Sequence, residues 1–278
     1  MERSSFMLGV AVGCAYNQCK FCNLFKHLQH RLPPLEQVEA ELKRVQRLGG
    51  NPQQVFLGDG NAFGMPTDRL LNILQMVAHY FPACQAVNMD ATVTDIRRKT
   101  DAELRQLYDA GVRNLYLGIE CGLDDVLAFM HKDHNLQQAY TAIARIQAAG
   151  LIFNAHIMTG IAGAGRGVEN AEALAEFFNH TRPLRVTNFS LFLSRSVSLY
   201  EEIEAGRFTP ADEAENLVEE RRLLELLKTD GLIYDGMHDW IEVRVRGVLP
   251  RDRDAMLQKL DEAIAQHSQL APVVALCR

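Results

Sequence analysis

The sequence predicts an α/β protein with a mostly parallel sheet, arranged as a partial (β/α)6 barrel of the TIM-like kind. Short apolar runs alternate with segments of helical periodicity along most of the chain. The runs begin again every ~30–40 residues, about the size of one strand–helix–strand unit. Such alternation favours parallel strands joined by right-handed crossovers. Six consecutive units fit a partial barrel better than a flat, doubly wound sheet.

The composition indicates a folded protein of enzyme size. The chain has 278 residues, 47% of them hydrophobic, and no low-complexity segment. Its net charge is −6 and no cluster of Lys and Arg stands out, so a dedicated nucleic-acid partner is not expected. No apolar run approaches the ~20 residues of a membrane helix. The apolar run after residue 5 is short for a signal core. We therefore expect a cytoplasmic protein with no membrane contact.

The individual elements follow from local patterns. Short apolar runs predict strands, and we place these at residues 6–12, 55–57, 86–90, 114–119, 152–158 and 186–193. Apolar residues at three- and four-residue spacing predict helices at residues 35–48, from 66 onward, 100–111, 123–130, 136–149 and 168–180. Pro66 starts one helix, Thr100 and Glu103 form a capping box, and Gly150 ends another helix.

After residue 195 the pattern changes. We expect a long amphipathic helix at 213–229, short strands at 232–234 and 241–246, and a closing helix at 251–266. We interpret residues 1–195 as the core barrel and residues 196–278 as an extension packed on it. The charged run Glu219-Glu220-Arg221-Arg222 is interpreted as a solvated helix face.

Three cysteines near the N-terminus predict a metal centre. Cys14, Cys19 and Cys22 lie within nine residues of a chain that otherwise reads as a reduced cytosolic protein, whereas Cys84, Cys121 and Cys277 are scattered and suggest neither a disulfide framework nor a second cluster. Soft thiolates select zinc, copper(I) or an iron–sulfur cluster. A four-iron cluster normally takes four cysteines, so three would leave one iron open for chemistry. The alternative is a zinc site that His27 or His30 completes, although both are also typical of an exposed loop.

Polar and glycine-rich turns follow the predicted strands. They are Gly58-Asp59-Gly60, Asp90, Glu120 and Gly160–Gly163. In parallel α/β folds, sites lie at the carboxyl ends of the strands. Turns of this kind also occur without any function, but their coincidence with three cysteines favours a site.

These residues are similar to those of the radical S-adenosylmethionine (radical SAM) enzymes, in the branch of the oxygen-independent coproporphyrinogen dehydrogenases and the methylthiotransferases. Most members carry Cys-x3-Cys-x2-Cys, whereas here the first gap has four residues. The run Gly13–Cys22 resembles a subgroup signature, Gly-Cys-x-x-Asn-x-Cys-x-Phe-Cys, in which Phe21 precedes the third cysteine. The run Gly247–Arg253 also resembles the end of that subgroup.

The resemblance implies S-adenosylmethionine contacts at several turns. The turn Gly58-Asp59-Gly60 stands where the family holds the amino group with its Gly-Gly-Glu backbone. Glu120 stands in the family's Gly-x-Glu-Ser-Gly and would face the methionine or ribose, and Lys132 would pair with the carboxylate.

The adenine contacts follow from the same resemblance. Gly160 and Gly163 bound a turn that would support the adenine. The strand residues Ser190 to Phe192 would flank it.

No catalytic residue can be assigned from the sequence, and three candidates stand out. Cys121 replaces the family's Ser and could donate a hydrogen atom, or it could fill a small buried space. His156 shares a strand face with Asn154 and Met158 and could touch the substrate or lie satisfied in the core. Tyr116 shares a strand face with Glu120.

The resemblance implies a function with two cofactors, a 4Fe-4S cluster and S-adenosylmethionine. The cluster would break a carbon–sulfur bond to give a 5′-deoxyadenosyl radical that acts on a small organic substrate. An electron donor such as flavodoxin or ferredoxin would be needed. The alternatives are a zinc-binding protein without catalysis and a cluster-binding sensor that does not turn over.

Overall fold

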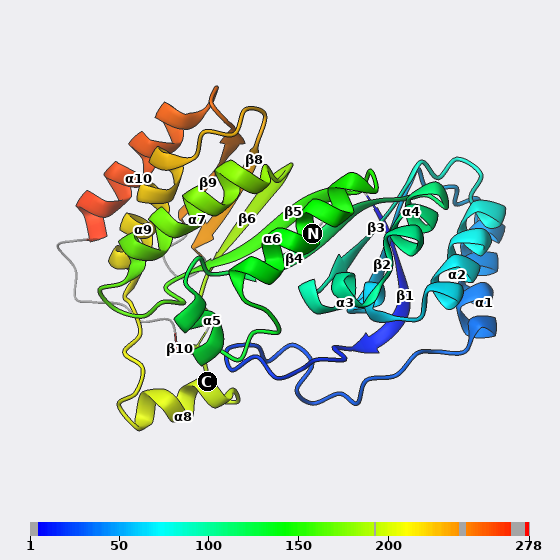
Figure 1. Ribbon diagram of the computed structural model, residues 1–278, viewed down its shortest axis with the longest axis horizontal. Helices are drawn as coiled ribbons and strands as arrows, with labels where there is room; N and C mark the ends of the chain where they lie inside the picture. Colours follow the sequence, from blue (N-terminus) through cyan, green and yellow to red (C-terminus); the bar gives the residue numbers. More distant parts are fainter. Residues whose placement is uncertain (1–4, 192, 239–242, 268–275, 278) are drawn as a thin grey trace. The chain divides into compact units, whose positions relative to one another are not determined.

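The computed structural model describes residues 5–191, 193–238, 243–267 and 276–277. Eight strands form one sheet in the order β1-β2-β3-β4-β5-β6-β8-β9 (Figure 1). They are β1 Phe6–Gly13, β2 Gln54–Gly60, β3 Ala86–Ala91, β4 Val112–Glu120, β5 Ile152–Thr159, β6 Arg185–Ser190, β8 Ile233–His238 and β9 Val243–Val248. The first six strands follow one another in chain order, whereas a doubly wound sheet reverses its order. The predicted α/β class with a mostly parallel sheet is confirmed.

Helices connect the strands. They are α1 Leu35–Arg47, α2 Thr67–Tyr80, α3 Val93–Arg98, α4 Asp101–Asp109, α5 Asp124–Phe129, α6 Leu136–Ala148, α7 Gly167–Thr181, α8 Ser198–Glu204, α9 Glu213–Leu226 and α10 Arg253–His267, with a 3-10 turn η1 Ala62–Gly64. The two-residue strands β7 Leu193–Ser194 and β10 Leu276–Cys277 pair in parallel. The short helices α3 and α8 were not predicted from the sequence.

The sixth predicted strand is shorter than expected. It ends at Ser190, and Phe192 lies outside the described residues. The strand expected at 241–246 is β9, and its predicted first two residues also lie outside the described part of the chain.

The chain divides into two compact units. The first contains Met1–Asn17, Leu24–Leu117 and Thr141–Phe153, and the second contains Gln18–Asn23, Gly118–Tyr140 and Asn154–Arg278. In the first unit β1, β2 and β3 pair in parallel, and α1 packs on α2. In the second unit β5, β6 and β8 pair in parallel and β9 runs antiparallel to β8. The division predicted at residue 195 stays a prediction.

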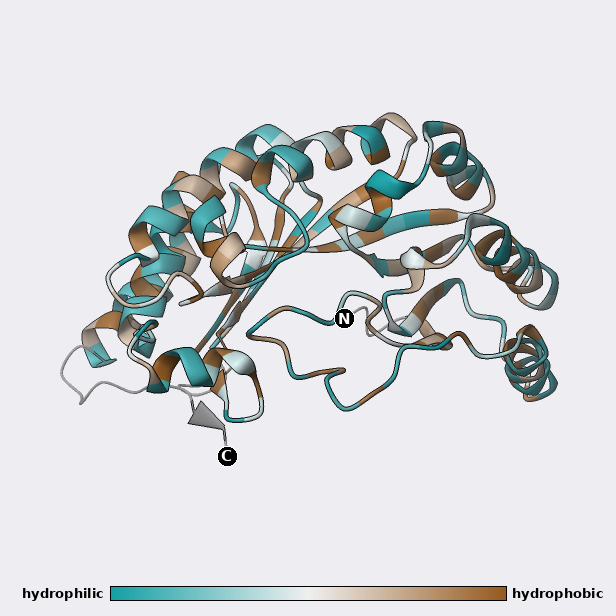
Figure 2. Ribbon diagram, turned by 60° about the horizontal axis from the view of Figure 1, so that its bottom comes forward, coloured by the Kyte–Doolittle hydropathy of each residue, from teal (hydrophilic) through white to brown (hydrophobic). Residues whose placement is uncertain are grey.

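Apolar and polar positions interleave along the elements of both units, as the coloring of Figure 2 shows. In the first unit, Leu8, Leu57 and Leu70 are fully buried or nearly so. In the second unit, α9 lies alongside both α7 and α10 (Figure 1). None of the described helices is long and apolar enough to cross a membrane.

The interpretation of the charged run in α9 as a solvated face is wrong for its two acids. Glu219 is 2% exposed and Glu220 is 0% exposed, whereas Arg221 and Arg222 are half-buried. The error arises because the buried stripe of α9 is mostly polar in its first two turns, where Leu217 is the apolar member, and apolar only in its last turn. The stripe contains Glu213, Asn216, Leu217, Glu219, Glu220, Leu223 and Leu224.

Candidate functional site

The first cysteine lies in the first unit, at the end of β1. Cys14 follows Gly13, and the backbone N–H of Asn17 donates to its Sγ at 3.4 Å. Asn17 adopts a left-handed conformation, with φ 46°, which Asn tolerates better than most residues. Its side-chain amide donates to the carbonyl of Phe25 at 2.9 Å. Asn17 is therefore the turn residue of the four-residue gap between the first two cysteines.

The turn after β2 is pressed against the backbone that precedes Cys14. Gly60 is in register with Gly13, and a Cβ on Gly60 would lie 2.1 Å from the Gly13 carbonyl oxygen. Asp59 also has a positive φ of 67°, and its side chain is exposed. A Cβ on Gly9 would meet the Asp59 carboxylate at 2.6 Å. The backbone of this turn is thus packed against β1 while the Asp59 side chain is exposed, and the cofactor role expected of the turn stays a prediction.

The other two cysteines belong to a short segment of the second unit that is anchored on both sides. The Lys20 N–H donates to the Met130 carbonyl at 3.0 Å, and the Lys20 carbonyl accepts from the Leu199 N–H at 3.0 Å. The Lys20 ammonium lies 2.8 Å from a carboxylate oxygen of Glu202. Phe21 is buried in an apolar cluster against which Cys19 and Cys22 pack.

The donor chemistry of the cysteines fits an iron–sulfur cluster. Cys14, Cys19 and Cys22 are half-buried thiols that form no disulfide within the described part of the chain, and sulfur donors in an apolar lining suit such a cluster. Burial raises the pKa of the Cys19 thiol to about 11, although Lys132 counteracts part of this effect. No group of three or more His, Cys, Asp or Glu side chains gathers into a metal-holding arrangement in the described part of the chain. The fit therefore rests on the type of donor.

A buried ion pair follows β4 in the second unit. The Lys132 ammonium lies 3.3 Å from Oε1 of Glu120, and the two side chains are 8% and 11% exposed. Glu120 has a φ of 64°, and its carboxylate folds over Gly118, where a Cβ would lie 2.2 Å from Oε1. Burial alone would lower the pKa of Lys132, but Glu120 and Cys19 outweigh it and raise the pKa above its usual range. The positive charge of Lys132 therefore acts on the Cys19 thiol, whose pKa it lowers against the effect of burial.

The turn after β5, from Gly160 to Gly163, is covered by side chains that the sequence analysis did not assign to it. The Gly160 N–H donates to Oε2 of Glu219 at 2.8 Å, and a Cβ on Gly160 would lie 2.5 Å from Oδ1 of Asn216. Gly163 lies under Phe208, and a Cβ on Gly163 would lie 3.1 Å from the Phe208 ring. Both glycines have positive φ, at 82° and 81°.

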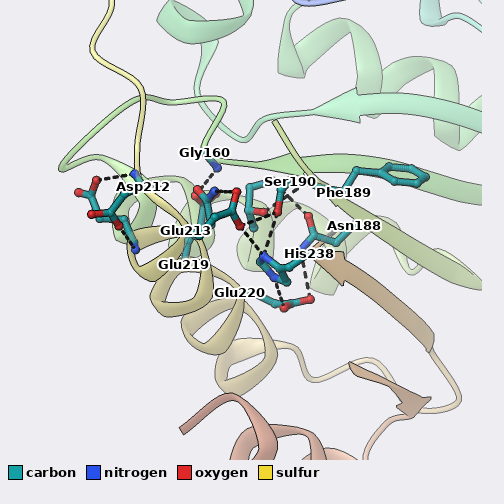
Figure 3. A network of polar contacts seen from close by, with 12 residues as sticks. Gly160, Asn188, Phe189, Ser190, Asp212, Glu213, Glu219, Glu220 and His238 are labelled. Atoms are coloured by element: carbon teal, nitrogen blue, oxygen red, sulfur yellow. Dashed lines mark hydrogen bonds and ion pairs between the residues drawn. The ribbon is translucent and has the colours of Figure 1, made fainter. Parts of the chain in front are cut away.

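The hydroxyl of Ser190 belongs to a buried polar network (Figure 3). It lies 2.8 Å from Nδ1 of His238, whose Nε2 lies 2.7 Å from Glu220. Glu213 approaches the same Nδ1 at 3.3 Å. Burial alone would lower the pKa of His238, but hydrogen bonds to Glu213 and Glu220 raise it to about 9. The signal that could have found Glu213 and Glu220 is their spacing on the leucine-bearing stripe of α9.

The three catalytic candidates occupy different surroundings. Cys121 is fully buried and donates to Oδ1 of Asn170 at 3.0 Å, and burial raises the pKa of its thiol. His156 is half-buried with its ring edge-on to Phe189, and burial lowers its pKa to about 4. Tyr116, in the first unit, packs against Phe56 at 5.7 Å between ring centroids. Their catalytic roles stay predictions. His27 and His30 are exposed, as expected.

The sequence model of the radical SAM superfamily matches residues 9–177, which is 169 of the 278 residues. No curated protein sequence matches the chain. The matched segment contains the three cysteines, the ion pair after β4 and the turn after β5. It ends before α9 begins.

Solved structures with a similar fold are related only distantly in sequence. Methylornithine synthase matches with a TM-score of 0.58 and 14% identity, over 98% of this chain and 83% of that one. Elp3 from the archaeon Methanocaldococcus infernus matches with a TM-score of 0.60 and 14% identity, over 97% and 64%. HydG, a maturase of the FeFe-hydrogenase, matches with a TM-score of 0.57 and 16% identity, over 80% and 48%. The chain thus spans less than two thirds of the last two proteins.

These likenesses show a shared fold, and the superfamily match covers more than half of the chain. Proteins of this superfamily bind a 4Fe-4S cluster and S-adenosylmethionine. The chain belongs to the radical SAM superfamily.

Proposed function

We propose that this enzyme holds a 4Fe-4S cluster with Cys14, Cys19 and Cys22 and uses S-adenosylmethionine to begin radical chemistry on a small organic substrate. When bound, the cluster supplies the electron that splits S-adenosylmethionine into methionine and a 5′-deoxyadenosyl radical. The chain itself binds and orients the reactants and excludes water.

The turn after β2 would contribute backbone groups. The Gly58-Asp59-Gly60 turn lies directly beside the residue before Cys14, with Gly60 and Gly13 in register. Its backbone would receive the amino group of S-adenosylmethionine. The exposed Asp59 side chain needs no direct contact in this arrangement.

The segments after β4 and β5 would contribute charged groups and a turn. Lys132 would pair with the carboxylate of S-adenosylmethionine, and Glu120 would face its methionine or ribose. The Gly160–Gly163 turn would support the adenine. The hydroxyl of Ser190 is engaged with His238, so we expect Ser190 to act on the adenine through its backbone or its packing.

The observation that carries this proposal is the buried pair of Lys132 and Glu120 beside Cys19. A buried ammonium is costly unless it is compensated, and here Glu120 and Cys19 both favour its charged form. A fixed positive charge next to a cysteine is suited to an anionic group that reaches the metal. A structural zinc site would not require it.

The test begins with protein purified without oxygen. We expect brown protein with about four iron and four sulfide per chain. S-adenosylmethionine and a strong reductant should then yield 5′-deoxyadenosine and methionine, and Cys19→Ala should abolish both products. Cys84→Ala is the matched control, because Cys84 is a half-buried cysteine outside the proposed ligand set.

Two results would contradict the proposal. Colourless protein with one zinc per chain would indicate a non-catalytic zinc protein. Brown protein that forms no 5′-deoxyadenosine would indicate a cluster-binding sensor.

The substrate and the partners are part of the same proposal. A small substrate agrees with the match to methylornithine synthase, which covers 83% of that enzyme. We place the enzyme in the cytoplasm, with flavodoxin or ferredoxin as its electron donor. A screen of both donors in place of the chemical reductant would identify the one that supports product formation.

A further inference from the structure

Two turns of the second unit share one chain of buried hydrogen bonds. Oδ1 of Asn170, on α7, accepts from the Gly122 N–H at 2.7 Å, directly after Glu120 and Cys121. The side-chain amide of Asn170 donates to Oε1 of Glu219 at 2.7 Å. Oε2 of Glu219 accepts from the Gly160 N–H at 2.8 Å. The turn after β4 and the turn after β5 are thereby joined through two side chains.

Only a carboxylate makes this connection complete. Both oxygens of Glu219 face N–H donors, one from Gly160 and one from Asn170. Glutamine has the same shape but presents one acceptor and one donor, so it can satisfy only one of the two. An aliphatic residue would leave both donors buried without a partner, which is costly.

Glycines allow α7 to approach the turn after β4 and α9 to approach α7. A Cβ on Gly167 would lie 2.9 Å from Oε2 of Glu219, and a Cβ on Gly122 would lie 2.6 Å from the backbone nitrogen of Leu174. Asn170 and Glu219 are 0% and 2% exposed. The packing leaves the two side chains few alternative positions.

We propose that Glu219, together with Asn170, is a positioning residue that holds the turn after β4 and the turn after β5 in the relative geometry that S-adenosylmethionine requires. Glu219 lies on α9, beyond the residues that the superfamily model matches. The C-terminal part of this chain therefore supplies part of the cofactor site's support. The inference rests on the proposed function, because it assumes that both turns contact S-adenosylmethionine.

The first experiment needs no cofactor. Hydrogen exchange is measured at the Gly122 and Gly160 amides in the cofactor-free full chain. Glu219→Ala should speed exchange at both amides, although Gly122 bonds to Asn170 and not to Glu219. In Glu219→Gln, one of these two amides should exchange more slowly than it does in Glu219→Ala. Leu224→Ala, a buried apolar change on α9, is the control for general destabilisation.

A specific pattern distinguishes the connection from ordinary packing. In Leu224→Ala, exchange at the two amides should speed up only as much as at the other amides of the second unit. In Glu219→Ala, exchange at these two amides should speed up more than at the others. In the double variant Asn170→Ala/Glu219→Ala, the Gly122 amide should exchange no faster than it does in Asn170→Ala alone. If Glu219→Ala leaves Gly122 unchanged, the two turns are not connected and the proposal is wrong.

The second experiment uses the cluster-loaded enzyme. Glu219→Ala should raise the KM for S-adenosylmethionine by about tenfold, the size of one lost buried interaction. The rate of cleavage at saturating S-adenosylmethionine should stay close to that of the wild type. A lower rate with an unchanged KM would overturn the positioning role. Failure of the wild type to cleave S-adenosylmethionine would instead refute the proposed function, and the exchange experiment would still test the connection.

Discussion

The two units hold their glycine turns in opposite ways. In the first unit, the turn after β2 lies against β1 through backbone contact, because Gly60 leaves no room for a side chain beside Gly13. In the second unit, the turn after β5 is held by the carboxylate of Glu219, which lies 59 residues further along the chain. The first arrangement requires a glycine without a Cβ at position 60, and the second requires the side chain of Glu219.

This difference has consequences for stability and for titration. A backbone contact changes little with pH and tolerates no added Cβ. A side-chain contact tolerates small displacements but connects the turn to every charge around it. Around Glu219 these charges include Glu220 and His238. Substitutions should therefore act mainly on folding in the first unit and mainly on cofactor binding in the second.

The largest effect is expected for Gly60→Ala. The new Cβ would meet the Gly13 carbonyl oxygen at 2.1 Å, so the backbone next to Cys14 would have to move. We expect a loss of about 3 kcal/mol in the free energy of unfolding, measured by urea denaturation, together with a loss of bound iron.

The control for this substitution is Gly49→Ala. Gly49 also has a positive φ, 81°, but a Cβ there would have no neighbour within 4 Å. It should therefore cost only the conformational strain of about 1 kcal/mol and keep full iron content. Equal effects of the two substitutions would show that the contact with Gly13 is unimportant.

A smaller loss of stability, with a selective loss of binding, is expected for Gly118→Ala. Its Cβ would meet Oε1 of Glu120 at 2.2 Å and Nζ of Lys132 at 3.2 Å, and both are ends of flexible side chains. They can move aside, so the free energy of unfolding should fall by less than about 2 kcal/mol. The KM for S-adenosylmethionine should rise at least about tenfold. An unchanged KM would contradict the role given to this ion pair.

Much of the fold could be predicted because its signals are local. Strand and helix periodicities, the Thr100 capping box and the glycine turns after β2 and β5 are all visible within a few residues. Helix α3 was missed because its apolar residues, Val93 and Ile96, are too few to establish a helical period. The αL turn at Asn17 was part of a motif, but its hydrogen bond to Phe25 could not be read from the spacing alone.

The support of the site could not be predicted because its partners are far apart in sequence. Glu219 bonds to Asn170 and Gly160, which precede it by 49 and 59 residues. A pair of glutamates before two arginines is most often a solvated face. The one available clue was the position of Glu213 and Glu220 on the stripe that also carries Leu217.

A moderate effect is expected from pH, and it should arise in the second unit. Burial raises the pKa of Glu219 from 4.5 to about 7. The hydrogen bonds to Glu213 and Glu220 outweigh burial and raise the pKa of His238 from 6.5 to about 9. Both pKa values are higher in the folded state, so protonation of each group favours the fold and the free energy of unfolding falls as pH rises; for Glu219 the cause is the desolvation cost of the carboxylate that accepts from Gly160 and Asn170. Glu219 makes the free energy of unfolding depend on pH between pH 4.5 and 7, and His238 does so between pH 6.5 and 9.

Urea denaturation at a series of pH values checks this prediction. The difference in free energy of unfolding between wild type and Glu219→Gln should fall by at most about 1.4 kcal/mol per pH unit up to about pH 7. The corresponding difference for His238→Gln should fall only above about pH 6.5. Taking differences cancels the other groups, such as Asp90 in the first unit, whose pKa burial raises to about 6. Differences that rise with pH would contradict the assigned direction.

The smallest effect is expected for Cys121→Ser. The thiol is fully buried and donates to Oδ1 of Asn170 at 3.0 Å, and a serine hydroxyl can donate to the same atom. Because that bond is kept, the free energy of unfolding should change by no more than about 1 kcal/mol. The yield of 5′-deoxyadenosine and the turnover of the substrate, once found, should match the wild type. If substrate turnover is lost while S-adenosylmethionine is still cleaved, Cys121 is a hydrogen donor, and the turn after β4 then carries chemistry in addition to the cofactor contacts proposed for Glu120.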